Sequence, residues 1–243
     1  MKRTHIPFIG ALACITALAA THHESALGAL RPVPAVRSES AGGNVTLRAL
    51  HDDDDKERAR ARIREQEAGT YVPEILLARD SALARWKPRS RPLTVWVQSR
   101  PDIEDWNDDY VTAVSDAFME WDAVELPGMR FRMVTDSAEA EIHVTWTPRF
   151  NEQISGRTRW SRDDNWWITN ASILLAIHHN QGDRLDESAM KAMALHEVGH
   201  LLGLDHTSMP MSIMAPRVRV RELEPVDIAT ARVIYSVAAG PLK

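Results

Sequence analysis

Cysteine is almost absent from this chain, which has 243 residues and a single thiol, at Cys14. A lone cysteine cannot form an intrachain disulfide, and it excludes the thiolate zinc sites that hold many small domains together. Positive charge is not in excess either: the formal net charge is −5, so nothing in this balance points to a nucleic-acid partner. The hydrophobic fraction of 44% instead indicates a globular protein with a core of ordinary size.

Long apolar runs are also missing, with one exception at the N-terminus. A basic start precedes an apolar stretch over residues 6–20, and residues 17–19 resemble a small-residue cleavage site. This pattern predicts a signal peptide over residues 1–19, because the stretch is short for a membrane span of about 20 residues. An uncleaved anchor and a lipoprotein site at Cys14 stay open as alternatives. We expect a secreted, periplasmic or cell-envelope protein that has no membrane segment once the signal is removed.

Residues 20–87 differ in composition from the rest, and we predict a partly helical pro-region or linker there. Prolines, glycines and serines over residues 31–46 favour a flexible linker. Four aspartates at 52–55 precede a lysine, and they form either an acidic helix start or a protease-sensitive link. The sequence predicts an exposed helix over 56–67 and a second helix over 71–86 that packs on the following domain.

His196, Glu197, His200, Gly203 and His206 stand in the spacing HExxHxxGxxH. Histidines four residues apart share one face of a helix, so both imidazoles can point at one metal ion. Gly203 can end that helix with a positive φ, which lets the chain return His206 as a third nitrogen ligand. Three protein ligands leave one position for water, as is typical of a catalytic zinc site, and Glu197 can reach that water. The alternative is an amphipathic core helix with solvated histidines.

A methionine-rich segment, residues 208–216, follows the third histidine. The whole region resembles the extended zinc motif and methionine turn of the metzincin peptidases, and in particular a matrixin of the bacterial type. In that family a methionine packs beneath the imidazoles, and Met214 best matches the local pattern Ile-Met-x-Pro. Met209 and Met211 lie nearer to His206 and stay open as alternatives.

Strand and helix patterns after residue 87 agree with that resemblance. Alternating or apolar runs predict strands over residues 93–97, 130–134, 141–146, 154–160 and 172–177. Helical spacing predicts helices over 108–121, 188–203 and 225–237, the first with Asp108 or Asp109 near its cap. The resemblance implies an α+β fold of the metzincin (zincin) class over residues 88–243. Such a domain has a twisted, mixed five-stranded sheet, two long helices including the zinc helix, a methionine turn and a C-terminal helix.

The chain departs at four points from features of matrixins or of other metzincins. Many matrixins are held latent by a propeptide cysteine, which the expected mature chain lacks. Val226 replaces the first of two adjacent acids on the C-terminal helix, while Asp227 keeps the second and is expected to support the methionine turn. Pro216 occupies the position at which some metzincins place a helper tyrosine. No second, structural zinc is predicted, and the remaining histidines of the domain are expected at the surface: His143, His178 and His179.

The resemblance implies a secreted zinc-dependent endopeptidase that acts as a monomer on protein or peptide substrates. One catalytic zinc would be held by His196, His200 and His206, with Glu197 as the general base. Gly203 would give structural support at the end of the zinc helix.

Substrate is expected to pair as an extended peptide with the edge strand above the zinc helix. The predicted contacts are Gly156, Thr158 and Trp160 on that strand, and Pro216 in the wall of the pocket beyond the scissile bond. Packing of a loop on the sheet explains the tryptophans of this region equally well. Calcium stays open, since solvated turns are an alternative for the residues that could hold it: Asp163, Asp164, Asn165, Asn180 and Asp183.

Two other functions also stay open from the sequence. A non-catalytic zinc-binding module could recognise peptides without cleaving them, although a purely structural site would not need Glu197. A zinc amidase could act on a non-protein amide, because the motif indicates metal-assisted hydrolysis and only the cleft determines the substrate.

Overall fold

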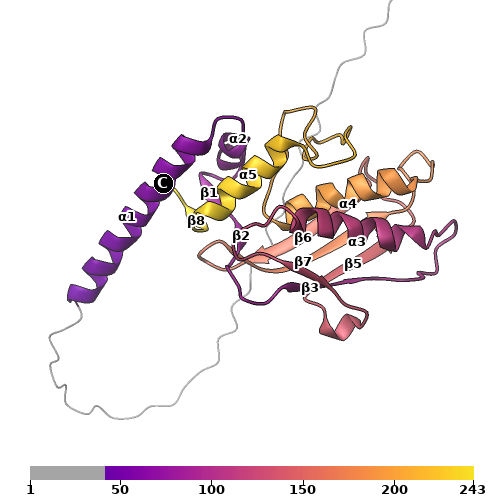
Figure 1. Ribbon diagram of the computed structural model, residues 1–243, viewed down its shortest axis with the longest axis horizontal. Helices are drawn as coiled ribbons and strands as arrows, with labels where there is room; N and C mark the ends of the chain where they lie inside the picture. Colours follow the sequence, from indigo (N-terminus) through magenta and orange to yellow (C-terminus); the bar gives the residue numbers. More distant parts are fainter. Residues whose placement is uncertain (1–41) are drawn as a thin grey trace, which may run out of the picture. The chain divides into compact units, whose positions relative to one another are not determined.

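The computed structural model describes residues 42–243, and its side chains are described from Asp54 onward (Figure 1). The predicted signal peptide over residues 1–19, Cys14 and residues 31–41 of the predicted linker lie outside this range. Within the described part, no helix combines the length and the apolar character that crossing a membrane requires.

A mixed sheet organises the described residues (Figure 1). Its five longer strands lie in the order β4-β3-β5-β7-β6, and all neighbours are parallel except β6, which runs antiparallel to β7. Their bounds are β3 Leu93–Val97, β4 Phe131–Met133, β5 Ile142–Thr147, β6 Gly156–Arg162 and β7 Trp167–Ala176. The expected five-stranded mixed sheet is therefore confirmed. A short strand, β2 (Arg85–Trp86), adds to it by pairing with the start of β7.

Two long helices pack against this sheet, α3 (Asp109–Asp122) and α4 (Glu187–Leu201) (Figure 1). Side chains of β5 alternate between buried and half-buried, as expected for a strand with one face on the core. The indole of Trp121 in α3 donates to the carbonyl oxygen of Leu195 in α4 at 2.9 Å, which ties the two helices together. The helix that carries the histidines is thus joined to α3 as well as packed against β6 and β7.

Local sequence explains how these two helices begin. The Asp186 side chain accepts the N–H of Ala189 at 2.6 Å and caps α4. Asp108 lies at the cap of α3, as predicted, but its side chain makes no capping bond. Asn107 takes that part instead, because its side-chain oxygen accepts the N–H of Asp109 at 3.1 Å.

The C-terminal part contains α5 (Pro225–Ser236), which begins with a capping box formed by Glu224 and Asp227. A short strand, β8 (Gly240–Pro241), then pairs antiparallel with β1 (Ala82–Leu83). This pairing holds the C-terminal strand against residues that come before the sheet in the sequence. Elsewhere, a 3₁₀ turn, Ser137–Glu139, precedes β5.

The first helix, α1 (Gly42–Gln66), corrects two predictions. The aspartates at 52–55 do not start a helix, because α1 already begins at Gly42 and runs through them. The predicted linker is wrong at its C-terminal end for the same reason. The Arg58 side chain bonds Asp55 one turn earlier, so the acids and the bases that follow support the helix together.

The predicted helix over 71–86 is wrong in its second half. It ends as α2 (Val72–Ala78), and Asp80 and Ser81 then take positive φ values of 51° and 63°. The chain continues into β1 and β2, because pairing with distant strands overrides the helical spacing of the apolar residues. The predicted packing on the following domain is confirmed, since Ile75 and Leu83 are fully buried.

Candidate metal centre

Three histidine side chains converge at the C-terminal end of α4. His196 and His200 lie one turn apart on that helix, and His206 follows in the loop after it. Their Nε2 atoms are 3.1 Å apart for His196 and His200, 3.2 Å for His200 and His206, and 3.3 Å for His196 and His206. Over residues 54–243, no other group of three metal-binding side chains is brought so close together. The structure therefore assembles the three residues that the spacing predicted.

Gly203 makes this arrangement sterically accessible. Its φ is +95°, a conformation that L side chains rarely adopt, and it turns the chain back after α4. An added Cβ would also overlap the carbonyl oxygen of Ala84, which packs directly on the turn. Two separate reasons therefore require glycine at this position: the positive φ of its backbone and the close approach of the Ala84 carbonyl oxygen.

Backbone carbonyls orient two of the three imidazoles. Nδ1 of His196 lies 2.7 Å from the carbonyl oxygen of Ile213, and Nδ1 of His200 lies 3.1 Å from that of Leu204. A carbonyl oxygen only accepts, so each Nδ1 carries the proton and each Nε2 presents a lone pair to the centre of the group. These two rings are thus held in the tautomer that binds a metal through Nε2.

The same environment keeps the histidines neutral. Burial lowers the pKa of His196 to about 4, and burial holds the pKa of His200 well below its usual value. The pKa of His206 is also lowered by burial, although the nearby carboxylate of Asp205 opposes this effect. Neutral imidazoles are the form that binds metal ions, so the site is prepared for a cation at neutral pH.

The geometry fits zinc. A tetrahedral zinc ion with Zn–N bonds of about 2.05 Å separates its ligand nitrogens by about 3.3 Å. The three separations of 3.1, 3.2 and 3.3 Å match this value closely. Three nitrogen lone pairs directed at one point would repel one another without a shared cation, and three protein ligands leave a fourth position open.

Glu197 lies between α4 and the edge strand β6. The Thr158 hydroxyl lies 2.6 Å from Oε2 of Glu197 and 2.9 Å from its backbone carbonyl oxygen. An added Cβ at Gly156 would overlap Oε1, so this glycine makes room for the carboxylate. Burial raises the pKa of Glu197 to about 7, and the hydrogen bond from Thr158 opposes that rise. The carboxylate is therefore oriented by β6 and shifted towards a pKa at which it can exchange protons.

Met214 packs against the part of α4 that carries the two histidines. It is fully buried, and an added Cβ on Gly199, which lies between His196 and His200 in α4, would overlap its sulfur. Met211 is 61% exposed. The turn itself is held by Asp227, whose carboxylate accepts from the N–H of Ile213 at 3.0 Å and from the Ser212 hydroxyl. The expected support of the turn by Asp227 is thus present as hydrogen bonds.

The residues predicted to bind substrate are not all in one place. Gly156 and Thr158 lie on β6 against Glu197, and Pro216 is exposed after the methionine turn. Trp160 is half-buried, with the guanidinium of Arg79 5.4 Å from the centre of its ring. Packing therefore accounts for Trp160, as the alternative from the sequence allowed, and its contact with substrate stays a prediction.

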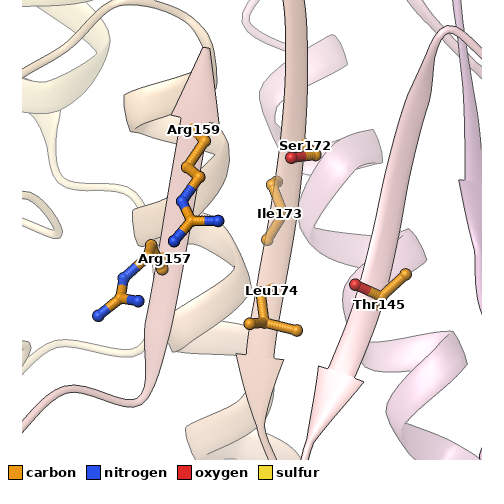
Figure 2. Close-up of a pocket in the computed structure, with 6 residues that line it drawn as sticks. All are labelled: Thr145, Arg157, Arg159, Ser172, Ile173 and Leu174. Carbon is orange, nitrogen blue, oxygen red and sulfur yellow. The ribbon is translucent and has the colours of Figure 1, made fainter. Parts of the chain in front are cut away.

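A separate pocket of about 150 Å³ opens on the sheet away from these residues (Figure 2). Figure 2 shows Arg157 and Arg159 extending from β6, with Ser172 and Leu174 on β7 and Thr145 on β5. Arg157 pairs with Glu152 at 2.8 Å, whereas Arg159 is exposed. The odd-numbered residues of β6 therefore give one face of the edge strand a positive charge.

The groups considered for other metals have their own partners. A single carboxylate oxygen of Asp163 accepts the N–H of Asn165 and of Trp167, both at 2.9 Å, which closes a turn. His178 was expected at the surface, and this prediction is wrong. Its side chain is buried, at 7% exposed, and its Nε2 lies 3.1 Å from a carboxylate oxygen of Asp105. His143 and His179 also bond within the chain, to the Ser137 carbonyl oxygen and the Ser155 hydroxyl.

Sequence reasoning missed the residues that reach the site from the N-terminal side. Tyr71 bonds Asp227, while Glu74 and Arg79 bond the loop that carries His206. Their order in the sequence gives no signal of these contacts, because each partner lies more than a hundred residues away. A charged residue in an apolar helical stretch was the one available indication.

Comparison with known proteins agrees with the geometry. Residues 148–236 match the family model described as matrixin. Metalloendoproteinase 1 of Glycine max is 23% identical over 176 residues, which cover 64% of this chain and 54% of that protein. Matrix metalloproteinase-C of Caenorhabditis elegans is 26% identical over 170 residues, which cover 57% of this chain and 28% of that protein. The chain therefore spans about half or less of the length of these relatives.

Proposed function

We propose that this chain, which is similar to matrixins over residues 148–236 and to two metalloproteinases, is a zinc-dependent endopeptidase that hydrolyses peptide bonds in proteins or peptides. The observation that carries the proposal is the convergence of three imidazole Nε2 atoms on one point, next to a buried carboxylate on the same helix. A purely structural zinc site would have no use for that carboxylate, since burying it without a role costs stability.

The zinc ion is assigned to His196, His200 and His206. When bound, zinc supplies Lewis acidity, which makes a water molecule more acidic and polarises the peptide carbonyl. The protein's own part is to hold the three rings neutral and correctly turned, through the carbonyl oxygens of Ile213 and Leu204. Met214 is assigned the methionine of the turn, because it is fully buried and its sulfur packs on Gly199, between the two histidines of the helix.

Glu197 is assigned the general base. Its carboxylate would take a proton from the attacking water and later deliver it to the nitrogen of the leaving amine. A pKa near 7 suits both transfers at neutral pH, since the group can then accept and release a proton with little driving force. Thr158 keeps Oε2 in place by its hydrogen bond, and Gly156 leaves room for Oε1.

Substrate is assigned to the free edge of β6. Among the described strands β6 pairs only with β7, so its other edge can accept an extended peptide beside Glu197. Since the Thr158 hydroxyl already bonds Glu197, contact of this side chain with substrate stays a prediction. Arg157 and Arg159 would then flank alternate side chains of the peptide and favour acidic ones.

The finer features follow the same proposal. Secretion or location in the periplasm or cell envelope, removal of residues 1–19, the bacterial-type subgroup and a monomeric state are proposed from the sequence. Calcium in the turns that contain Asp163 and Asp183 also stays a prediction.

Substitution of the general base tests the proposal. Glu197→Gln in the full chain is expected to retain zinc and to lose about 10²- to 10⁴-fold in the rate of casein cleavage. Glu187→Gln is the matched control, because Glu187 is an exposed acid in the first turn of the same helix. Zinc content and cleavage would be measured on the same samples.

Three outcomes would contradict the proposal. Normal cleavage by Glu197→Gln would exclude the assigned mechanism. Stoichiometric zinc in a wild-type chain that cleaves no member of a broad peptide library would favour a binding module. Hydrolysis of a cell-wall amide without peptide cleavage would favour a zinc amidase.

A further inference from the structure

Residues 70–86, which we name the docked segment, lie against the loop that carries His206. We propose that this segment is a permanent brace of the metal centre, with Glu74 and Arg79 as positioning residues, and that any maturation of the chain leaves it in place. The proposal rests on the zinc site proposed above. It also replaces the predicted boundary of the pro-region at residue 87 with one before Thr70.

Glu74 holds the C-terminal half of the histidine loop, which we define as residues 203–208. Its carboxylate accepts three hydrogen bonds: from the N–H of Ser208 at 2.7 Å, and from the hydroxyls of Thr207 and Ser208, both at 3.1 Å. Thr207 is 2% exposed, and its N–H donates to the carbonyl oxygen of Met214 at 3.1 Å. One carboxylate therefore fixes the residue after His206 and, through it, the methionine turn.

Arg79 holds the N-terminal half of the same loop. Its guanidinium donates to the carbonyl oxygens of Gly203 at 2.8 Å and Leu204 at 3.3 Å, and to the Asp205 carboxylate at 3.1 Å. The other oxygen of that carboxylate accepts the N–H of His206 at 2.9 Å. The side chain of Arg79 is 12% exposed, and a cation there also suits the carbonyl oxygens at the end of α4.

His206 needs this support more than the other two histidines do. The rings of His196 and His200 are each turned by a hydrogen bond from Nδ1 to a carbonyl oxygen. Over the described residues, no such partner is found for Nδ1 of His206, whose Nε2 lies beside those of the other two imidazoles. Its backbone, in a loop without regular structure, must therefore determine where Nε2 lies. Glu74 and Arg79 hold that backbone on both sides.

The rest of the docked segment could not be removed without exposing the core. Tyr71 donates its N–H to the Thr230 hydroxyl at 3.1 Å and its own hydroxyl to Asp227 at 3.3 Å. Ala84 presents its carbonyl oxygen to Gly203, and the strands β1 and β2 pair with β8 and β7. In contrast, residues 67–69 are exposed, and Gly69 has no atom near the position of an added Cβ. A cleavage site suits this exposed link.

Zinc affinity tests the brace. Glu74→Gln and Arg79→Met are expected to weaken zinc binding about 10-fold each, and the double variant about 100-fold, because outer contacts of a ligand typically contribute this much. Affinity would be measured by competition with a chromophoric chelator, on full chains whose folding has been verified by circular dichroism. Glu141→Gln and Arg89→Met are matched controls: this pair bonds at 2.8 Å away from the loop and should leave zinc affinity unchanged.

The results separate the brace from the proposed function. Unchanged zinc affinity in both brace variants would overturn the brace, and so would a lower melting temperature of the metal-free chain with no loss of affinity. A wild-type chain that binds no zinc would overturn the proposed function and the brace together. Mass spectrometry of the active form is expected to find an N-terminus before Tyr71, and an active form that starts at Pro88 would also overturn the brace.

Discussion

Two neighbouring regions, α1 and the docked segment, were predicted from the sequence as parts of one pro-region. In the structure they differ in how they attach to the rest of the protein. Among the described side chains of α1, only Ala59 and Ile63 are buried. The docked segment buries most of its residues and exchanges hydrogen bonds with α5, with the histidine loop and with β7. The change in composition near residue 87 therefore does not mark the start of the folded unit, because the docked segment before it is already part of that unit.

The difference has a simple physical origin. Ala59 and Ile63 are four residues apart, so the described side chains of α1, from Asp54 onward, meet the rest of the unit along a narrow stripe. The docked segment turns at Asp80 and Ser81 and buries most of its residues, so its buried polar groups must find partners inside the protein. Arg85 illustrates this: it is 5% exposed and donates to the carbonyl oxygen of Val237 at 2.8 Å.

The largest effect is expected where the docked segment meets the end of α4. Gly203→Ala would combine a strained positive φ with overlap against the Ala84 carbonyl oxygen, and we expect it to lower the free energy of unfolding by about 4 kcal/mol. Gly69→Ala is the control, since its φ is +79° with open space around the new Cβ, and the strain alone should cost about 1 kcal/mol. Urea denaturation measures both. Equal losses would mean that contact with Ala84 contributes nothing.

The metal centre was predictable from sequence because most of it is local. The spacing of His196 and His200 fixes them on one helical face, and Gly203 and His206 follow within a few residues. Met214 and Asp227 could be assigned only through the resemblance to matrixins, since Asp227 holds the methionine turn from a separate element, through the N–H of Ile213. The sheet was predictable for a related reason: strands such as β5 alternate as a strand with one buried face must.

The docked segment was not predictable, because its partners are distant in the sequence. Apolar residues between Tyr71 and Trp86 fit helical spacing, and nothing nearby shows that β8 and β7 will pair with the second half. The carboxylate of Glu74 likewise reads as one of many surface acids until Ser208 is placed beside it. Contacts of this kind leave no trace in local periodicity.

The second prediction compares an isoleucine-to-alanine substitution in the docked segment with one in α1. Ile75 is completely buried in α2, so Ile75→Ala is expected to cost about 3 kcal/mol through lost burial and the cavity that remains. Leu77→Ala is its control on the same helix, because Leu77 is 86% exposed and should change stability by less than about 0.5 kcal/mol. If Ile75→Ala were as mild as the control, the segment would be only loosely attached.

The smallest effect is expected in α1. Ile63 is 4% exposed, so its burial resembles that of Ile75, yet Ile63→Ala should cost only about 1 kcal/mol in global stability. The reason is that α1 can separate locally: from Asp54 onward its buried side chains are Ala59 and Ile63, and Arg60 bonds the Leu242 carbonyl oxygen. The substitution should appear instead as faster trypsin cleavage after the basic residues of α1, with zinc content unchanged. A cost close to that of Ile75→Ala, or loss of zinc on cleavage, would show that α1 belongs to the same cooperative unit as the docked segment.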